Sequence, residues 1–323
     1  MKKKILIIFV ILIMFSLGGC QVSSVLFLSF HDMNLSDGNN IDNSLTKDEF
    51  FAKNLVIIPE KDNKGNDPLL NSAATLLVDT TDNKAIYADH VYDKLYPASF
   101  TKLLTALVAL KYGNLTDPVT ISYEASHVTE PGAKLCGFEE GDVVSLETLL
   151  NSLLIYSGND AAVAIADYLG GSEEEFVNMM NDEAKLIGAV HSNFVNANGL
   201  HDDNHYTTAY DLYLIFNELM KYDTFLKIIH TNSYTAVYTD KIGNEKQKDF
   251  TSANEYLSGV VAPPDGIEII GGKTGTTIKA GNCLIILARD SNDKEYIALI
   301  LKASDNAALY HQMSHLLSLI PKK

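Results

Sequence analysis

The chain has 323 residues, of which 46% are hydrophobic and 20% charged, with 41 acidic side chains against 25 basic ones. The formal net charge of -16 argues against a nucleic-acid-binding protein, because phosphate binding requires concentrated lysine and arginine. Arg289 is the only arginine, so a bidentate arginine clamp for phosphate or carboxylate is not expected. The composition is too apolar for a disordered chain, and three cysteines are too few for a disulfide scaffold.

The first residues have the pattern of an export signal. Three lysines at positions 2–4 precede an apolar run over residues 5–17, shorter than the roughly 20 residues of a spanning helix. The sequence Leu-Gly-Gly-Cys that ends at Cys20 resembles the lipobox of bacterial lipoproteins. This resemblance implies a signal peptide over residues 1–19, lipid on the Cys20 sulfur, and an extracytoplasmic protein anchored to the outer face of the cytoplasmic membrane. An ordinary signal peptide with a coincidental cysteine is the alternative.

Composition divides the remaining chain into a tether and one domain. Residues 20–67 are mostly Asn, Asp, Ser and Lys with little periodicity, which indicates a flexible tether. Residues 68–323 carry regular patterns, with a strand pair at 73–78 and 85–88 and short apolar strands at 267–270, 284–288 and 296–301. Helical spacing marks 99–112, 146–154, 161–169, 176–187, 209–220 and 307–320. The predicted fold is α+β, with an antiparallel sheet formed by both chain ends and a helical subdomain.

The first candidate motif is Ser99-Phe100-Thr101-Lys102, at the start of the predicted helix after Pro97. A spacing of three places the Ser99 hydroxyl and the Lys102 amine on one helix face. Serine needs a base to become a nucleophile, and lysine can be that base when burial lowers its pKa. Taken alone, the motif is equally compatible with Ser99 as a helix N-cap and a solvated Lys102.

Two further motifs supply polar groups from other parts of the chain. Ser157-Gly158-Asn159 lies between two predicted helices, where a second hydroxyl can relay a proton and an amide can orient a substrate; a helix break is the simpler explanation. Lys273-Thr274-Gly275 follows an apolar strand, where lysine and threonine can bind a carboxylate and glycine admits a substrate backbone. A glycine-rich turn with an exposed lysine is the alternative for this motif.

The order and spacing of the three motifs are more specific than any one of them. Ser157 follows Ser99 by 58 residues and Lys273 follows Ser157 by 116, a constellation that resembles the penicillin-binding protein and serine β-lactamase superfamily. The flanking stretches YPAS, SGNDAA, FVNANGL and KTGTT with a following Ala-Gly are similar to those of the low-molecular-mass D-alanyl-D-alanine carboxypeptidases, peptidase family S11. The similarity runs from about residue 73 to the end, and it implies a β-lactamase/transpeptidase-like catalytic domain.

The resemblance implies acyl transfer at the D-Ala-D-Ala end of peptidoglycan stem peptides. Ser99 would be the nucleophile and Lys102 its base, with the oxyanion between the amides of Ser99 and Thr276. Ser157, aided by Lys273, would donate a proton to the departing D-alanine, and Asn159 would position the substrate. Lys273 and Thr274, beside Gly275, would bind the terminal carboxylate. No metal or cofactor is implied, and β-lactam antibiotics would be covalent inhibitors.

The sequence departs from the family pattern in two places. Some members carry a carboxylate-binding arginine on the strand after the K-T-G strand, whereas here no arginine lies near residues 301–304. Arg289 is expected at the far end of its strand, so Lys302 or Ser304 are candidates to substitute. The chain ends about 50 residues after the K-T-G motif. We therefore expect it to lack the C-terminal β-domain and anchor common in the family, with the lipid on Cys20 in their place.

Several alternatives are less favoured by the sequence. A serine β-lactamase of class A uses a glutamate roughly 35 residues beyond the second motif, and residues 191–196 contain no acid. A non-catalytic, muropeptide-binding lipoprotein is the other alternative. The stretch from His201 to His205 could suggest a metal site, but it lacks helical spacing, and a polar loop at the rim of the cleft, braced by His205, is preferred. Cys136 and Cys283 are expected to be free thiols rather than a disulfide.

Overall fold

The two ends of the described chain meet in one sheet. The computed structural model describes residues 55–321, so Cys20, the predicted signal peptide and residues 20–54 of the predicted tether lie outside the described residues. A five-stranded antiparallel sheet has the order β2-β1-β9-β8-β7, which confirms the predicted α+β fold with a sheet built from both ends. Its strands are β1 (Ala74–Asp79), β2 (Lys84–Asp89), β7 (Ile267–Thr277), β8 (Gly281–Asp290) and β9 (Glu295–Ala303).

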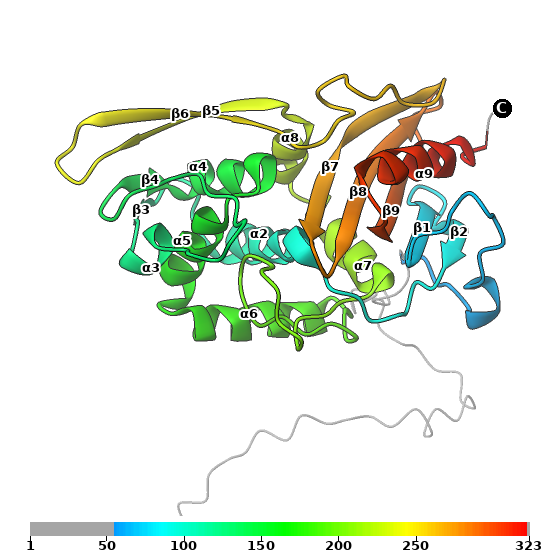
Figure 1. Cartoon of the computed structure of the whole chain (residues 1–323), viewed down its shortest axis with the longest axis horizontal. Coiled ribbons are helices and arrows are strands. Elements are labelled where there is room, and N and C mark those ends of the chain that lie inside the picture. The colour runs from blue at the N-terminus through cyan, green and yellow to red at the C-terminus, as the bar shows by residue number, and fades with distance from the viewer. Residues whose placement is uncertain (1–54, 322–323) are drawn as a thin grey trace, which may run out of the picture. The chain divides into compact units, whose positions relative to one another are not determined.

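Each face of this sheet buries its own hydrophobic core. Successive residues of a strand point to opposite faces, so Leu76 of β1 faces the core beneath the helices while Leu77 faces α9. Figure 1 shows α9 against one side of the sheet, with α2 and α7 on the other. The longer helices are α2 (Thr101–Tyr112), α5 (Asn159–Gly170), α6 (Glu173–Leu186), α7 (Ala209–Leu219), α8 (Asp223–His230) and α9 (Asn306–Ser318).

Helix α2 lies in the middle of the fold, as its apolar sequence predicted. Its residues from Thr101 to Ala109 are all buried, including Lys102. A one-turn 3-10 helix, η2 (Ala98–Phe100), leads into it and carries Ser99. Short elements complete the helical region: η1 (Glu60–Asp62), α3 (Tyr123–Ser126), α4 (Leu146–Asn151) and the π-helical turn η3 (Ser152–Tyr156).

A second, four-stranded sheet lies on the far side of the helical region and was not predicted. It has the order β3-β4-β5-β6, with β3 (Pro118–Thr120), β4 (Val143–Ser145), β5 (Ser233–Thr239) and β6 (Glu245–Thr251). Strands β5 and β6 form the long hairpin that extends from the body in Figure 1. Only Phe250 is buried on β6, so the sequence lacks the apolar alternation that identifies a strand.

The domain begins earlier in the chain than the sequence predicted. Residues 55–67 were assigned to the flexible tether, yet Val56 and Ile58 are buried against the main core. The hydroxyl of Tyr213 accepts from the Val56 amide at 3.0 Å, and the hydroxyl of Tyr92 donates to the Ile58 carbonyl at 2.6 Å. The correction has a physical cause, since the apolar run over residues 55–58 is too short to show a helical or strand period, yet Val56 and Ile58 still pack against the finished domain.

Within residues 55–321, no helix is both long and apolar enough to cross a lipid bilayer.

Candidate active site

The first motif forms a hydrogen-bonded serine–lysine pair at the start of α2. Ser99 lies in the turn before the helix and Lys102 in its first turn, and the Lys102 Nζ donates to the Ser99 Oγ at 3.2 Å. Ala98, just before the serine, has φ of 47°, which is uncommon for a residue with a side chain. The loop at Gly199 passes so close that a Cβ there would lie 1.8 Å from the Ala98 carbonyl oxygen. A glycine is therefore required at position 199 to let this loop hold the serine turn.

Lys102 is completely buried and has three hydrogen-bond acceptors. Besides Ser99, its Nζ donates to Asn159 Oδ1 at 2.8 Å and to the Asn198 carbonyl at 2.5 Å. Burial lowers the pKa of Lys102 to about 7, because removing the ammonium from water disfavours the charged form. Cys136 and Asp160 oppose this lowering of the Lys102 pKa, and the positive charge of Lys134 contributes to it. A large part of Lys102 is therefore neutral at pH 7 and able to accept a proton from Ser99.

The second motif turns the chain sharply between η3 and α5. Ser157 has a left-handed backbone with φ of 72°, which places its side chain on a fixed corner after the helical turn. Its Oγ accepts a hydrogen bond from Lys273 Nζ at 2.9 Å. Two residues later, the Asn159 Nδ2 donates to the Lys134 carbonyl at 3.1 Å, so that Oδ1 of the same amide faces Lys102.

The third motif lies on β7, one of the two edge strands of the main sheet. Lys273 is 2% exposed, and its Nζ also donates to the Thr274 carbonyl at 2.9 Å. Burial lowers the pKa of Lys273 well below its usual value, and the charges of Lys102 and Lys134 act in the same direction. A Cβ at Gly275 would lie 3.4 Å from the Ser99 amide nitrogen, which shows how closely this strand passes Ser99.

The three motifs meet at one cleft, as the resemblance to the penicillin-binding protein superfamily implied. Its volume is about 990 Å³, and Lys102 and Lys273 lie buried beneath it, hydrogen-bonded to its two serines. The predicted site residues that line it are Ser99, Ser157, Asn159, Thr274, Gly275 and Thr276. Every predicted site residue within residues 55–321 is therefore in or directly below this cleft, whereas Cys20 lies outside the described residues.

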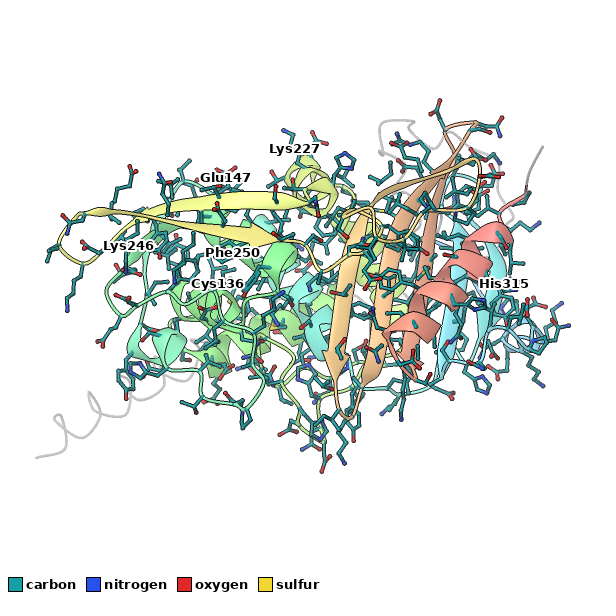
Figure 2. The ribbon with its side chains drawn as sticks, turned by 45° about the horizontal axis from the view of Figure 1, so that its top comes forward. Cys136, Glu147, Lys227, Lys246, Phe250 and His315 are labelled. Atoms are coloured by element: carbon teal, nitrogen blue, oxygen red, sulfur yellow. The ribbon has the colours of Figure 1, made fainter. Side chains whose placement is uncertain are left out.

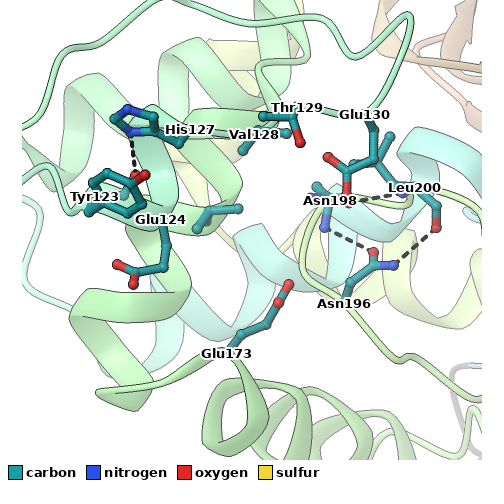
Figure 3. A pocket seen from close by; sticks show the side chains of 11 residues that line it. Tyr123, Glu124, His127, Val128, Thr129, Glu130, Glu173, Asn196, Asn198 and Leu200 are labelled. Atoms are coloured by element: carbon teal, nitrogen blue, oxygen red, sulfur yellow. Dashed lines mark hydrogen bonds between the residues drawn. The ribbon is translucent and has the colours of Figure 1, made fainter.

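A smaller pocket of about 370 Å³ borders the cleft on the helical side. Figure 3 shows Glu124, Glu130 and Glu173 around it, together with the amides of Asn196 and Asn198. Glu130 and the two asparagines also line the main cleft, so the two hollows share a wall.

The loop from His201 to His205 borders the cleft as expected. His201 and Asp202 line it, while His205 is buried behind them. The His205 Nδ1 accepts from the Val195 amide at 3.4 Å, so Nε2 carries the proton and donates to Thr101 Oγ1 at 2.8 Å. Burial lowers the pKa of His205 to about 4, which keeps the ring neutral at pH 7. His205 thus braces the loop against α2, as predicted.

The predictions for the two cysteines and for Arg289 can also be compared with the structure. Cys136 and Cys283 are both free thiols, which confirms the prediction that they form no disulfide. Arg289 lies at the end of β8 away from the motifs and pairs with Glu295 at 3.1 Å. The two candidates to replace an arginine, Lys302 and Ser304, do not line the cleft. The lysines that line it are instead Lys134 and Lys279.

Sequence reasoning missed two groups that hold the site together, the Asp160 carboxylate and the Asn198 carbonyl. Asp160 accepts from the amides of Cys136 at 2.9 Å and Gly137 at 2.7 Å, and it fixes the loop that carries Lys134. The carbonyl of Asn198 is an acceptor for Lys102. Asp160 adjoins the second motif and Asn198 lies in the stretch FVNANGL, so their positions were visible although their contacts were not.

Comparison with known proteins agrees with this geometry. The model of the peptidase S11 family, described as D-alanyl-D-alanine carboxypeptidase, matches residues 61–305. The chain belongs to this family. The D-alanyl-D-alanine carboxypeptidase DacF of Bacillus subtilis is 33% identical over 256 residues, which cover 76% of this chain and 61% of that protein. DacC of Escherichia coli is 30% identical over 259 residues, again 61% of its length.

A solved structure supports the fold assignment. The crystal structure of a Streptomyces DD-transpeptidase superposes with a TM-score of 0.72 at 27% identity, covering 79% of this chain and 98% of that one. The peptidase S11 family and the penicillin-binding fold recognised in the sequence are thereby confirmed. The chain spans about 61% of the length of the two curated relatives named above.

Proposed function

We propose that this chain is a serine-type D-Ala-D-Ala carboxypeptidase that removes the terminal D-alanine of peptidoglycan stem peptides through an acyl-enzyme on Ser99. The observation that carries the proposal is the arrangement of two serine–lysine pairs, Ser99 with Lys102 and Ser157 with Lys273, in one cleft. Membership of the peptidase S11 family supports it. Because the chain covers about 61% of its curated relatives, their activity is carried over here as a proposal.

Acylation begins when neutral Lys102 takes the proton of the Ser99 hydroxyl. The Ser99 Oγ then attacks the carbonyl carbon of the penultimate D-alanine, and the resulting oxyanion accepts from the amides of Ser99 and Thr276. Preorganised donors of this kind stabilise charge that develops in the transition state. The close passage of Gly275 beside the Ser99 amide supports this placement of the oxyanion.

Release of the product requires a proton and a site for its carboxylate. As the C–N bond breaks, Ser157 donates its hydroxyl proton to the departing amine of D-alanine and regains one from Lys273, to which it is hydrogen-bonded. Thr274 and Lys273 bind the terminal carboxylate, whose negative charge raises the pKa of Lys273 and favours the charged lysine. Water then attacks the ester carbonyl, and Lys102 returns to the departing Ser99 oxygen the proton that it took during acylation. As the product carboxylate forms, one proton of the water passes to Lys273 and the other to the solvent, so the serine and both lysines regain their starting states.

The same first step accounts for covalent binding of β-lactams. The Ser99 Oγ opens the lactam ring, whose carbonyl takes the place of the peptide carbonyl, and the penicilloyl ester remains on the enzyme. Fast hydrolysis of that ester, as in class A β-lactamases, depends on an additional glutamate. Residues 191–196 contain no acid, which supports slow release and disfavours the β-lactamase alternative.

The test is release of D-alanine from a peptide that ends in D-Ala-D-Ala. The wild-type protein should release one D-alanine per peptide, and the Ser99→Ala variant should release none. Binding of the peptide without release would favour a non-catalytic muropeptide-binding protein, and rapid turnover of benzylpenicillin would favour a β-lactamase. Either result would contradict the proposal.

We also propose that the protein is exported and anchored by lipid on Cys20 to the outer face of a bacterial cytoplasmic membrane. The support is sequence alone: the basic start, the apolar run over residues 5–17 and the Leu-Gly-Gly-Cys sequence. The 35 residues from Cys20 to Leu55 can span at most about 120 Å, which limits how far the domain can lie from the membrane. Replacing Cys20 with Ala should move the protein to the soluble fraction, and continued membrane association would contradict a lipid anchor.

A further inference from the structure

Lys134 is a cation in the cleft to which the proposed mechanism gives no task. It is half-buried and lines the same cleft as Ser99 and Asn159. Its Nζ lies 4.0 Å from the centre of the Tyr156 ring. The ion pairs found among residues 55–321 do not include Lys134, although Glu130 and Asp202 also line the cleft.

The loop that carries Lys134 is held in place from several directions. The Lys134 carbonyl accepts from both the amide and the side chain of Asn159, at 2.8 and 3.1 Å. Two residues further on, the Cys136 amide donates to Asp160, and its carbonyl accepts from Lys248 of β6 at 3.0 Å. Figure 2 labels Cys136 and the neighbouring hairpin residue Lys246. These contacts fix the backbone at Lys134, so its ammonium group has a defined place in the cleft.

The surroundings of the ammonium group favour an anionic ligand. The ring of Tyr156 stabilises the cation only in part, since a cation–π contact is weaker than a hydrogen-bonded carboxylate. Tyr156 is in turn fixed by the Phe250 ring, with centroids 4.8 Å apart. Burial lowers the pKa of Lys134, which shows that its charge is not fully compensated by the protein. A carboxylate placed beside it would restore that compensation.

We propose that Lys134 binds a carboxylate on the acyl part of the substrate, so that the enzyme prefers stem peptides with a free carboxylate upstream of the cleaved bond. The position of Lys134 distinguishes this carboxylate from the terminal one. Lys134 adjoins Asn159 on the helical wall, whereas the terminal carboxylate is assigned to Thr274 and Lys273 on β7. The inference deepens the proposed function and rests on it.

Two penicillins that differ by one carboxylate on the acyl side chain provide the test. We would measure acylation of Ser99 by benzylpenicillin and by α-carboxybenzylpenicillin and compare the ratio of their second-order rate constants. In Lys134→Gln, the rate constant for the carboxylated penicillin divided by that for the neutral one should fall about tenfold, which is the effect of losing one charge-assisted hydrogen bond. Lys134→Arg should keep most of the wild-type ratio. Lys227→Gln, on the exposed surface of α8, removes the same charge outside the cleft and should keep the wild-type ratio.

Each other outcome has a defined meaning. An equal loss for both penicillins, or a shift of both pH profiles together, would overturn the proposal and assign Lys134 to tuning Lys102. An unchanged ratio would overturn it as well. A binding measurement decides the role of Lys134 even if Ser99 is never acylated. In the Ser99→Ala background, with and without Lys134→Gln, we would compare the dissociation constants of two D-Ala-D-Ala peptides, one with a free upstream carboxylate and one with that group as an amide. Absence of acylation in the wild type would instead overturn the proposed function.

Discussion

The two walls of the cleft differ in how their polar groups are held. On the helical wall, Lys102 has three acceptors and the Asn159 side chain is bound at both ends. On the strand wall, Thr276 is exposed, and no hydrogen bond of the Thr274 or Thr276 hydroxyl is found within residues 55–321. β7 is also an edge strand, so a peptide can add to it as a further strand. The helical wall is thus organised for chemistry before the ligand arrives, and the strand wall is free to bind it.

The largest effect should follow from removing the base of the helical wall. We expect Lys102→Met to slow acylation of Ser99 by benzylpenicillin by about 100- to 10,000-fold, the usual contribution of a general base. The measurement is the rate of covalent labelling by a fluorescent penicillin. A rate within tenfold of the wild type would show that another group activates Ser99.

A glycine near the serine turn tests how tightly that wall is packed. Gly199 has φ of 87° and no room for a Cβ beside Ala98, whereas Gly171 has φ of 72° and no atom within 4 Å of a Cβ. We expect Gly199→Ala to lower the free energy of unfolding by about 3 kcal/mol, from backbone strain plus a steric clash, and Gly171→Ala by about 1 kcal/mol from strain alone. Equal effects in urea denaturation would contradict the close contact.

The loop below Lys134 should depend on a single carboxylate. Asp160→Asn exchanges one carboxylate oxygen for an amide donor, which cannot accept from the backbone amides of the loop. We expect a loss of about 2 kcal/mol of unfolding free energy, typical of hydrogen bonds to a charged group. The same change at exposed Asp265 is the control and should have an effect below about 0.5 kcal/mol. Similar values for both variants would mean that Asp160 does not hold the loop.

A methyl group added at Gly275 of the strand wall should slow acylation without lowering stability. A Cβ at Gly275 meets its nearest protein atoms at 3.4 to 3.5 Å, which is ordinary contact, but it occupies space beside the Ser99 amide. Gly275→Ala should therefore keep the wild-type melting temperature while acylation slows roughly tenfold through displacement of the reacting carbonyl. A large fall in melting temperature would show that the strand wall is as tightly constrained as the helical one.

The pH dependence should be the mildest effect. The account needs Lys102 in its neutral form, and burial lowers its pKa to about 7. The rate of acylation should therefore reach a plateau above about pH 8 and decline as the pH falls through 7. From pH 7 to pH 6 we expect roughly a fivefold loss of rate, since the neutral fraction falls by that factor. A profile that stays flat down to pH 5 would contradict Lys102 as the base.

The sequence predicted those parts of the site that depend on local spacing. Ser99 and Lys102 are three residues apart where a 3-10 turn leads into α2, and Lys273 continues an apolar run into β7, so each local geometry was visible in the pattern. Their meeting in one cleft was inferred from the resemblance to a family rather than from spacing, because 116 residues separate Ser157 from Lys273.

The parts that could not be predicted depend on contacts between distant segments. Lys134 looks like any loop lysine until Asn159 binds its carbonyl and the contacts of Cys136 with Asp160 and Lys248 fix the loop two residues further on, and none of these contacts follows a periodic pattern. The β5–β6 hairpin and the docked residues 55–67 were missed for the same reason, since few of their side chains are buried and the buried ones follow no long period. The structure of such segments depends on burial against distant parts of the chain, which the periodicity of the sequence does not indicate.

Peptide mapping by mass spectrometry after incubation with benzylpenicillin tests the central claim most directly. The account predicts one penicilloyl group per protein, located on Ser99, released over a much longer time than it forms, and absent from Ser99→Ala. A penicilloyl group on another residue, or labelling of Ser99→Ala at the wild-type rate, would contradict the assignment of Ser99 as the nucleophile.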